Sequence, residues 1–167
     1  AYDVVNRLLS KAPDARRAEP AVGFTYTPTG RRASMSDASG TTTYGYNSRD
    51  RLVIKATPQG VLSYTYDVGG NLTRIQSDHA GGASMEYTYD ARNRLATVTD
   101  ATGTTSYSYD PVGNLTGFVY PKGVQTAYAY NPLNRLTNVT ASKAGTLASY
   151  TYTLGASGNR TAVTEAN

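Results

Sequence analysis

The 167-residue sequence contains no cysteine and no tryptophan, and only 17% of its residues are charged. The absence of cysteine excludes a disulfide framework and any cysteine-based metal site. No run of about 18 apolar residues occurs, which excludes a membrane-spanning helix. The chain begins Ala1-Tyr2-Asp3, without an initiator methionine or a basic-then-apolar leader. We therefore expect a piece of a longer polypeptide or a processed product.

Tyrosine is the abundant large side chain, with 15 copies against 2 phenylalanines, and glycine occurs 16 times. Hydrophobic residues make up 39% of the chain and the mean hydropathy is −0.46. This aromatic content is too high for a disordered chain, and the length suits one ordinary domain. Composition thus predicts a turn-rich β protein in which tyrosine supplies most of the apolar surface.

Fourteen of the 15 tyrosines fall in one repeated frame, and only Tyr120 lies outside it. The frame is an aromatic pair of the form Tyr-x-Tyr, whose second members recur every 20 to 24 residues. Repeats of this length indicate an array of supersecondary units. The second aromatic residues are Tyr2, Tyr26, Tyr46, Tyr66, Tyr89, Tyr109, Tyr130 and Tyr152.

A fixed pattern follows most pairs: Asp or Asn comes next, then Gly, Asn or Asp four residues after the second tyrosine, then Arg or Asn, then Leu in six of seven copies. We expect these positions to define the structure of the repeat. The repeat-defining residues are Tyr44, Tyr46, Tyr64, Tyr66, Asp67, Gly70, Leu72, Tyr87, Tyr89, Asp90, Arg94, Leu95, Tyr107, Tyr109, Asp110, Gly113, Leu115, Tyr128, Tyr130, Arg135 and Leu136.

Each position of the repeat has a physical role in a β-hairpin. Tyr-x-Tyr places two rings on one face of a strand, because strand side chains alternate with period 2. The Asp or Asn begins a turn, and the Gly or Asn slot suits a residue with positive φ. Leu then begins the return strand. The predicted fold is all-β, with tandem hairpins of about 20 to 24 residues.

About eight hairpins side by side would give a sheet of some 15 strands. Open twisted sheets of that size curl, so a spiral or shell segment is expected, held by contacts between neighbouring repeats. We predict a single array over residues 1–167, interrupted by a loop near 11–21 that contains Pro13 and Pro20.

Two details of the repeat stay open. Leu72 and Ile75 are three residues apart, as are Leu95 and Val98. Such spacing puts the two side chains on opposite faces unless a β-bulge intervenes, so either a bulge or two partly covered faces is expected. The last copy departs from the frame, because Tyr152 reaches Gly158-Asn159-Arg160 only after a two-residue insertion.

The pattern Tyr-x-Tyr-Asp-x-x-Gly-Arg/Asn-Leu resembles the YD repeat of the RHS/YD-repeat family, most clearly at Tyr64–Leu72 and Tyr107–Leu115. The resemblance implies a β-sheet spiral that winds into a hollow shell, which in bacterial members encloses a toxic C-terminal domain and in teneurins carries adhesion modules. It further implies a structural wall segment, secreted or at the cell surface, with other YD repeats and an enclosed toxin domain as partners.

The chain is short for such a shell, since family shells use many more than eight repeats. Exposed edge strands can pair with further strands. We therefore expect either a segment of a longer spiral or copies joined head to tail in a filament or tube. Asp110-Pro111-Val112-Gly113 has the letters of the family's self-cleavage motif, but it occupies the ordinary turn slot, and we interpret it as a turn.

An enzyme is not expected, nor is a cofactor or a metal site. His79 is the only histidine and stands in a loop-like Ser-Asp-His-Ala-Gly-Gly segment without a nucleophile motif around it. The recurring aspartates occupy a turn slot, which favours a structural role over paired catalytic carboxylates.

Binding functions are the alternatives. The net charge of +4 makes nucleic-acid binding one candidate function. However, six arginines recur at the same place beside the turn, which favours a ladder of hydrogen bonds between repeats instead. These are Arg7, Arg31, Arg51, Arg94, Arg135 and Arg160. Exposed tyrosine rows favour a carbohydrate-binding or adhesion module with surface glycans as ligands. Four Asn-x-Thr sequons, at Asn71, Asn114, Asn138 and Asn159, are explained mainly by turn chemistry.

Overall fold

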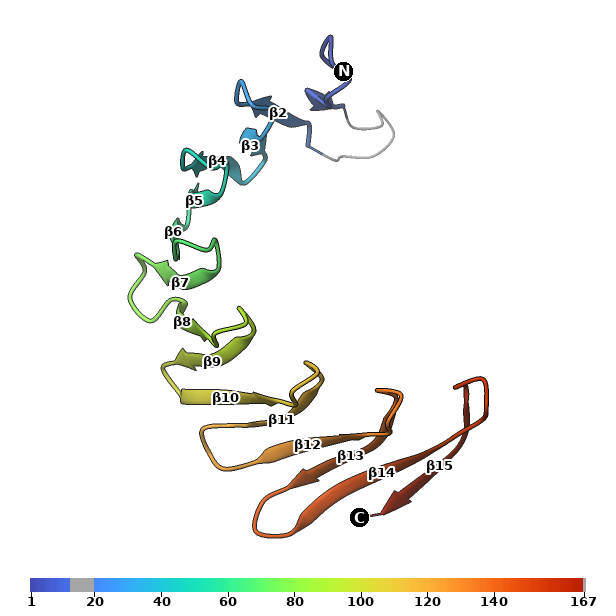
Figure 1. The fold of residues 1–167 in the computed structure, drawn as a ribbon. Coiled ribbons are helices and arrows are strands. Elements are labelled where there is room, and N and C mark those ends of the chain that lie inside the picture. The colour runs from blue at the N-terminus through green and yellow to red at the C-terminus, as the bar shows by residue number, and fades with distance from the viewer. Residues whose placement is uncertain (13–19, 167) are drawn as a thin grey trace. The chain divides into compact units, whose positions relative to one another are not determined.

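The computed structural model describes residues 1–12 and 20–166. These residues form fifteen strands and no helix, so the predicted all-β fold is confirmed (Figure 1). The loop predicted near 11–21 lies mostly outside the described residues, between Lys11 in β1 and Val22 in β2. No helix among the described residues is long and apolar enough to cross a membrane.

The chain divides into two compact units, Ala1–Ser84 and Met85–Asn167, which are described separately. In the first unit, strands that follow one another in sequence are neighbours in the sheet, in the order β1 to β7. These strands are β1 (Ser10–Lys11), β2 (Val22–Tyr26), β3 (Arg32–Asp37), β4 (Gly40–Tyr46), β5 (Leu52–Thr57), β6 (Gly60–Tyr66) and β7 (Leu72–Ser77).

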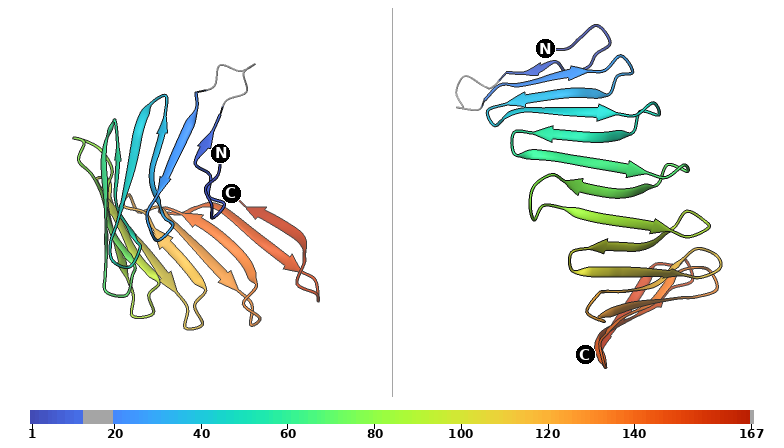
Figure 2. Two further views of the ribbon diagram at one scale, coloured as in Figure 1. Left: turned by 90° about the horizontal axis from the view of Figure 1, so that it is seen from above. Right: turned by 90° about the vertical axis from the view of Figure 1, so that its left-hand side faces the viewer.

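The second unit has the same arrangement in the order β8 to β15, and strand directions change progressively within each unit (Figure 2). Such rotation is the expected twist of an antiparallel sheet. Its strands are β8 (Ser84–Tyr89), β9 (Leu95–Asp100), β10 (Gly103–Tyr109), β11 (Leu115–Val119), β12 (Gln125–Tyr130), β13 (Leu136–Ser142), β14 (Thr146–Leu154) and β15 (Arg160–Ala166).

A one-residue β-bulge occurs at the same position in each of the seven repeat hairpins. In β6–β7, Tyr66 pairs with Leu72 and Tyr64 pairs with Ile75, so one extra residue lies between Leu72 and Ile75 on the return strand. The extra residue brings both aliphatic side chains opposite the two tyrosines. The Leu-x-x-Ile spacing therefore reflects a β-bulge and not two partly covered faces, the alternative that the sequence left open.

The bulge gives the sheet two chemically different faces. One face carries the tyrosines with their aliphatic partners, and these side chains are mostly half-buried. The other face carries hydroxyl side chains that pair across strands, for example Thr88 with Thr97 at 2.6 Å and Thr99 with Thr104 at 2.9 Å. We call these the aromatic face and the hydroxyl face.

Neither unit has a conventional core among its described residues. No hydrophobic side chain is fully buried, and Thr42, with 8% of its surface exposed, is the one buried polar residue. The largest ring cluster surrounds Phe118, whose ring centroid lies 5.9 Å from that of Tyr107, 5.1 Å from Tyr120 and 6.1 Å from Tyr128. Within each unit the sheet is a single layer, so apolar contacts run between neighbouring strands of that layer.

In the last hairpin the strand register differs from the one that the spacing of the tyrosines predicted. Leu154 pairs with Arg160, and Tyr152 pairs with Val163, which is the register that the second and first tyrosines have elsewhere. The turn that follows has its ordinary length, because the amide of Gly155 donates to the Asn159 carbonyl at 2.9 Å. The two extra residues therefore lengthen β14 to nine residues. Leu154 occupies the second tyrosine position, and Arg160 occupies the leucine position.

Candidate functional site: an arginine–tyrosine ladder

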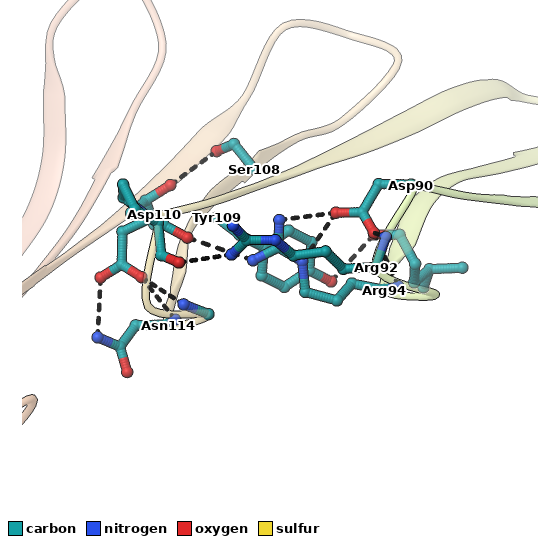
Figure 3. Close-up of polar contacts among 11 residues, drawn as sticks. Asp90, Arg92, Arg94, Ser108, Tyr109, Asp110 and Asn114 are labelled. Carbon is teal, nitrogen blue, oxygen red and sulfur yellow. Dashed lines mark hydrogen bonds and ion pairs between the residues drawn. The ribbon is translucent and has the colours of Figure 1, made fainter.

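Where the turn after a Tyr-x-Tyr strand begins with aspartate, the carboxylate of that residue closes it. Oδ1 of Asp90 accepts hydrogen bonds from the backbone amides of Arg92 and Arg94, at 2.8 and 3.0 Å. Oδ2 accepts a third from Arg94 Nε at 2.7 Å (Figure 3). An aspartate that bonds amides two and four residues ahead fixes the turn and orients the arginine.

The oriented arginine then contacts the next hairpin. The Arg94 guanidinium carbon lies 4.4 Å from the centre of the Tyr109 ring, and Arg94 NH1 donates to the Asp110 carbonyl at 3.2 Å. In the opposite direction, the Tyr109 hydroxyl donates to the Leu95 carbonyl at 3.0 Å. One step between hairpins thus combines a cation–π contact with two hydrogen bonds.

The same step recurs along both units, and we call the series the arginine–tyrosine ladder. The corresponding guanidinium-to-ring distances are 4.7 Å for Arg7 over Tyr26 and 4.6 Å for Arg51 over Tyr66. The tyrosine hydroxyl bonds span 2.8 to 3.0 Å; they join Tyr26 to Leu8, Tyr46 to Arg32, Tyr66 to Leu52, Tyr109 to Leu95 and Tyr130 to Leu115.

Where asparagine replaces the arginine, its side chain closes its own turn but is too short to stack on the tyrosine ring of the next hairpin. Asn71 and Asn114 donate from Nδ2 to Oδ2 of Asp67 and Asp110, at 2.9 and 2.8 Å. Asn114 Nδ2 also donates to Oδ1 of Asn134, at 2.9 Å, so the next turn extends a side chain back toward it.

These two kinds of step alternate from Arg51 onward, a pattern that the sequence frame did not predict. The pairs at the positive-φ and Arg/Asn slots are Asn6-Arg7, Gly30-Arg31, Asp50-Arg51, Gly70-Asn71, Asn93-Arg94, Gly113-Asn114, Asn134-Arg135 and Gly158-Asn159. From Arg51 onward an arginine slot is followed by glycine in the next turn, and an asparagine slot is followed by asparagine. Arg31 is the exception, because Asp50 follows it, with Oδ2 at 4.0 Å from Arg31 Nε.

Room for the guanidinium favours glycine at two of these turns. At Gly158, whose φ is +91°, an added Cβ would lie 2.8 Å from Arg135 NH1, and at Gly70 it would lie 3.2 Å from Arg51 NH1. At Gly30 and Gly113 the corresponding distances to Arg7 and Arg94 are 3.8 and 4.0 Å, which is ordinary contact. Glycine is therefore favoured most at Gly158 and Gly70, and asparagine, which tolerates positive φ, is accepted where no arginine reaches across.

The turn carboxylates are held in their charged form. Hydrogen bonds from the Arg94 amide and side chain lower the pKa of Asp90, and those from the Asn71 side chain and amide lower the pKa of Asp67. On the aromatic face, desolvation raises the pKa of the Tyr64 and Tyr107 hydroxyls, which stay neutral.

Four ladder turns lack the carboxylate, since they begin with Thr27, Asn47, Asn131 and Gly155. The Oδ1 atoms of Asn47 and Asn131 accept from the turn amides. An asparagine offers an amide nitrogen where aspartate offers a second acceptor. Among the described residues, Nε of Arg51 and Nε of Arg135 are the buried side-chain nitrogens without a hydrogen-bond partner.

The predicted repeat residues divide between the ladder and the aromatic face. Second tyrosines contribute to the ladder, and first tyrosines pair across the hairpin with aliphatic or aromatic residues. These pairs are Tyr64 with Ile75, Tyr87 with Val98, Tyr107 with Phe118 and Tyr128 with Val139; Tyr44 instead faces Lys55.

The residues considered for chemistry lie apart from one another. His79 is exposed in the loop between β7 and β8. Asp110-Pro111-Val112-Gly113 forms an ordinary turn, in which the Gly113 amide donates to the Asp110 carbonyl at 3.1 Å. Within residues 1–12 and 20–166, no three histidine or acidic side chains gather in a way that could hold a metal ion.

A chain of tandem Tyr-x-Tyr-Asp hairpins joined by this ladder is a β-repeat scaffold, and comparison with known families identifies its kind. The family model of the RHS repeat matches residues 26–62, 66–105, 89–125 and 109–146. The chain belongs to the RHS repeat family.

Solved structures share the fold. The crystal structure of TcdB2-TccC3-Cdc42 aligns over 99% of this chain with a TM-score of 0.76 at 16% sequence identity. The pore form of the Photorhabdus luminescens Tc holotoxin aligns over 98% with a TM-score of 0.54 at 18% identity. This chain spans about 11% and 12% of those chains, respectively. No curated protein sequence matches it.

Proposed function

We propose that these residues are wall material of an RHS-type shell: a non-catalytic scaffold, one part of a longer array of YD repeats, that helps to enclose a polypeptide cargo. Membership of the RHS repeat family and the fold shared with TcdB2-TccC3 structures support this proposal. The repeat-defining residues would serve as the joints between successive hairpins.

The observation that carries the proposal is the combination of a regular ladder with a single sheet layer. Each ladder step joins one hairpin to the next, so the layer can be extended by adding hairpins. Among the described residues, however, the layer buries no hydrophobic side chain and leaves its aromatic face half-exposed. Such a layer suits the wall of a shell, in which further turns of the spiral or an enclosed polypeptide would cover the aromatic face.

The cargo that we propose is a toxin-type domain, acting outside the producing cell. One similar structure is a Tc holotoxin pore, and another is TcdB2-TccC3 without its hypervariable C-terminal region. The enclosed segment would contact the wall through side chains of the layer, without any catalytic step by the wall.

The test uses the polypeptide from its natural source that carries residues 1–167. Its intact mass is measured, it is treated with a nonspecific protease, and the fragments are identified by mass spectrometry. A mass far above 17.8 kDa, with a non-repeat segment that resists protease until the repeats are cleaved, supports a shell.

Two other results would replace the proposal. A mature product of 17.8 kDa that forms uniform fibres in negative-stain images would make the chain a filament subunit. A monomer of that mass that binds glycans on an array would make it an adhesion module.

A further inference from the structure

The last ladder step contains a pocket beside Leu154, which stands where other steps have a tyrosine; a cavity of about 400 Å³ also adjoins the step of Arg94 and Tyr109. A cavity of about 470 Å³ opens between the start of β13, the end of β14 and the turn that leads into β15. It is lined by Arg135, Leu136, Tyr152, Leu154, Gly158 and Arg160.

The register shows what is missing from this pocket. Leu154 stands in the second tyrosine position, which a tyrosine fills in the steps that end at Tyr26, Tyr66 and Tyr109. In those steps the ring lies 4.4 to 4.7 Å from a guanidinium carbon. A leucine side chain covers less area than a phenol ring and carries no hydroxyl.

The remaining parts of the step are in place. Arg135 lies against Gly158, where an added Cβ would approach NH1 to 2.8 Å, just as Arg51 lies against Gly70. Leu136 stands where Leu95 and Leu115 offer a backbone carbonyl to a tyrosine hydroxyl.

We propose that this pocket binds a phenol group, specifically the tyrosine side chain of another polypeptide segment. The ring would lie over the Arg135 guanidinium, and the hydroxyl would donate to the Leu136 carbonyl, which are the contacts that tyrosines of this chain make at the equivalent positions. The cation–π contact needs only an aromatic ring, whereas the hydrogen bond needs the hydroxyl, so the site would bind a phenol more tightly than a plain aromatic ring.

The experiment is a titration of the isotope-labelled chain with p-cresol, the free form of the tyrosine side chain, followed by NMR. Saturable shifts confined to the amides near Arg135 and Gly158 are expected, with a dissociation constant on the order of millimolar for so small a ligand. Toluene, which lacks the hydroxyl, should bind at least about five-fold more weakly.

Two variants and a control place the binding in the pocket. Leu154→Tyr and Leu154→Phe fill it from within and should abolish the p-cresol shifts; with two variants, failure of one to fold leaves the other. Leu147→Tyr makes the same change on β14 at an exposed position, where 53% of the leucine surface is accessible. That control should bind p-cresol as the parent chain does.

Three results would overturn the proposal. Equal binding of toluene would remove the hydroxyl contact, and unchanged p-cresol binding by a folded Leu154→Phe variant would place the ligand elsewhere. Displacement of p-cresol by millimolar phosphate or acetate would make the pocket an anion site built on Arg135 and Arg160. None of these results depends on whether the chain belongs to a shell.

Discussion

At the scale of single residues, the turn aspartate has two tasks. One oxygen closes the turn, and the other holds the arginine that contacts the next hairpin, as Asp90 does for Arg94. Asparagine at the same position performs only the first task. Turns that begin with asparagine therefore hold their arginine less firmly, and replacing the amide nitrogen by a carboxylate oxygen should strengthen them.

Asn131→Asp should stabilise the chain, because the new carboxylate oxygen gives Arg135 Nε the acceptor that it lacks. For a hydrogen bond worth about 1 kcal/mol in a chain of this length, the Tm should rise by about 2 to 4 °C. Thermal unfolding followed by circular dichroism measures the change. The mirror variant Asp90→Asn should lower the Tm, and a rise in both would refute the assignment of the second oxygen.

Acid should weaken the ladder. The pKa values of Asp3, Asp67 and Asp90 are lowered by hydrogen bonds within their turns. A carboxyl group with a lower pKa when folded stabilises the fold above its unfolded value of about 3.9, and this contribution disappears as the pH falls through the folded value. The Tm should be constant from about pH 7 to 5 and fall below about pH 4.

The acid effect has its own control. Asp90→Asn removes one of the lowered groups, so its Tm should depend less on pH below about 4 than that of the parent chain. An equal dependence in the two proteins would mean that acid acts on other groups.

At the scale of the hairpin, the sequence predicted the strands and turns well because each hairpin is encoded locally. Tyr-x-Tyr, the turn aspartate and the positive-φ slot all act within about ten residues. The predicted positive φ is confirmed, for example at Asn93 and Gly113. The bulge stayed open because a three-residue spacing is compatible with either a bulge or two covered faces.

Other features were missed because they arise between hairpins. The stacking of Arg94 on Tyr109 joins residues that are 15 positions apart, and nothing in one repeat indicates which partner the arginine chooses. The alternation of Gly70-Asn71 with Asn93-Arg94 was visible in the letters, but its meaning depends on the reach of a side chain into the next turn. In the last copy, the frame placed Tyr152 where the register places Leu154.

A pair of substitutions tests the alternation. Asn114→Arg alone should destabilise the second unit, because Asn134 occupies the space that the guanidinium needs. Combined with Asn134→Gly, the new arginine can lie over Tyr130, as Arg94 lies over Tyr109. A double-mutant cycle should give a favourable coupling of about 1 kcal/mol.

The cycle is measured by urea unfolding of the four proteins. Asn134→Gly by itself is the control for the change in backbone freedom, since Asn134 already has a φ of +58°. Additive effects of the two substitutions would show that arginine and glycine are not matched across the step.

At the scale of the whole molecule, the chain is held together by neighbour contacts and not by a buried centre. Among the described residues no hydrophobic side chain is fully buried. The surface exposed on unfolding should therefore be small for a chain of 167 residues.

Denaturant unfolding should report this directly. Because the slope of unfolding free energy against denaturant scales with newly exposed surface, the urea m-value should fall clearly below that of a globular domain of equal length. A sandwich domain of similar length serves as the reference. A slope equal to the reference would mean that the chain buries its aromatic face in solution.

The match between arginine and glycine in successive turns also bears on how such a gene can change. Removal of residues 110–130 would join Tyr109 to the turn of Asn134, so that an asparagine replaces Gly113 in the turn after Arg94. Removal of 110–154 would join Tyr109 to the turn of Gly158 and keep a glycine there. The longer deletion should give the more stable of the two proteins in thermal unfolding, and the opposite order would contradict the match. From Arg51 onward, deletions or insertions of hairpin pairs should therefore be tolerated better than those of single hairpins.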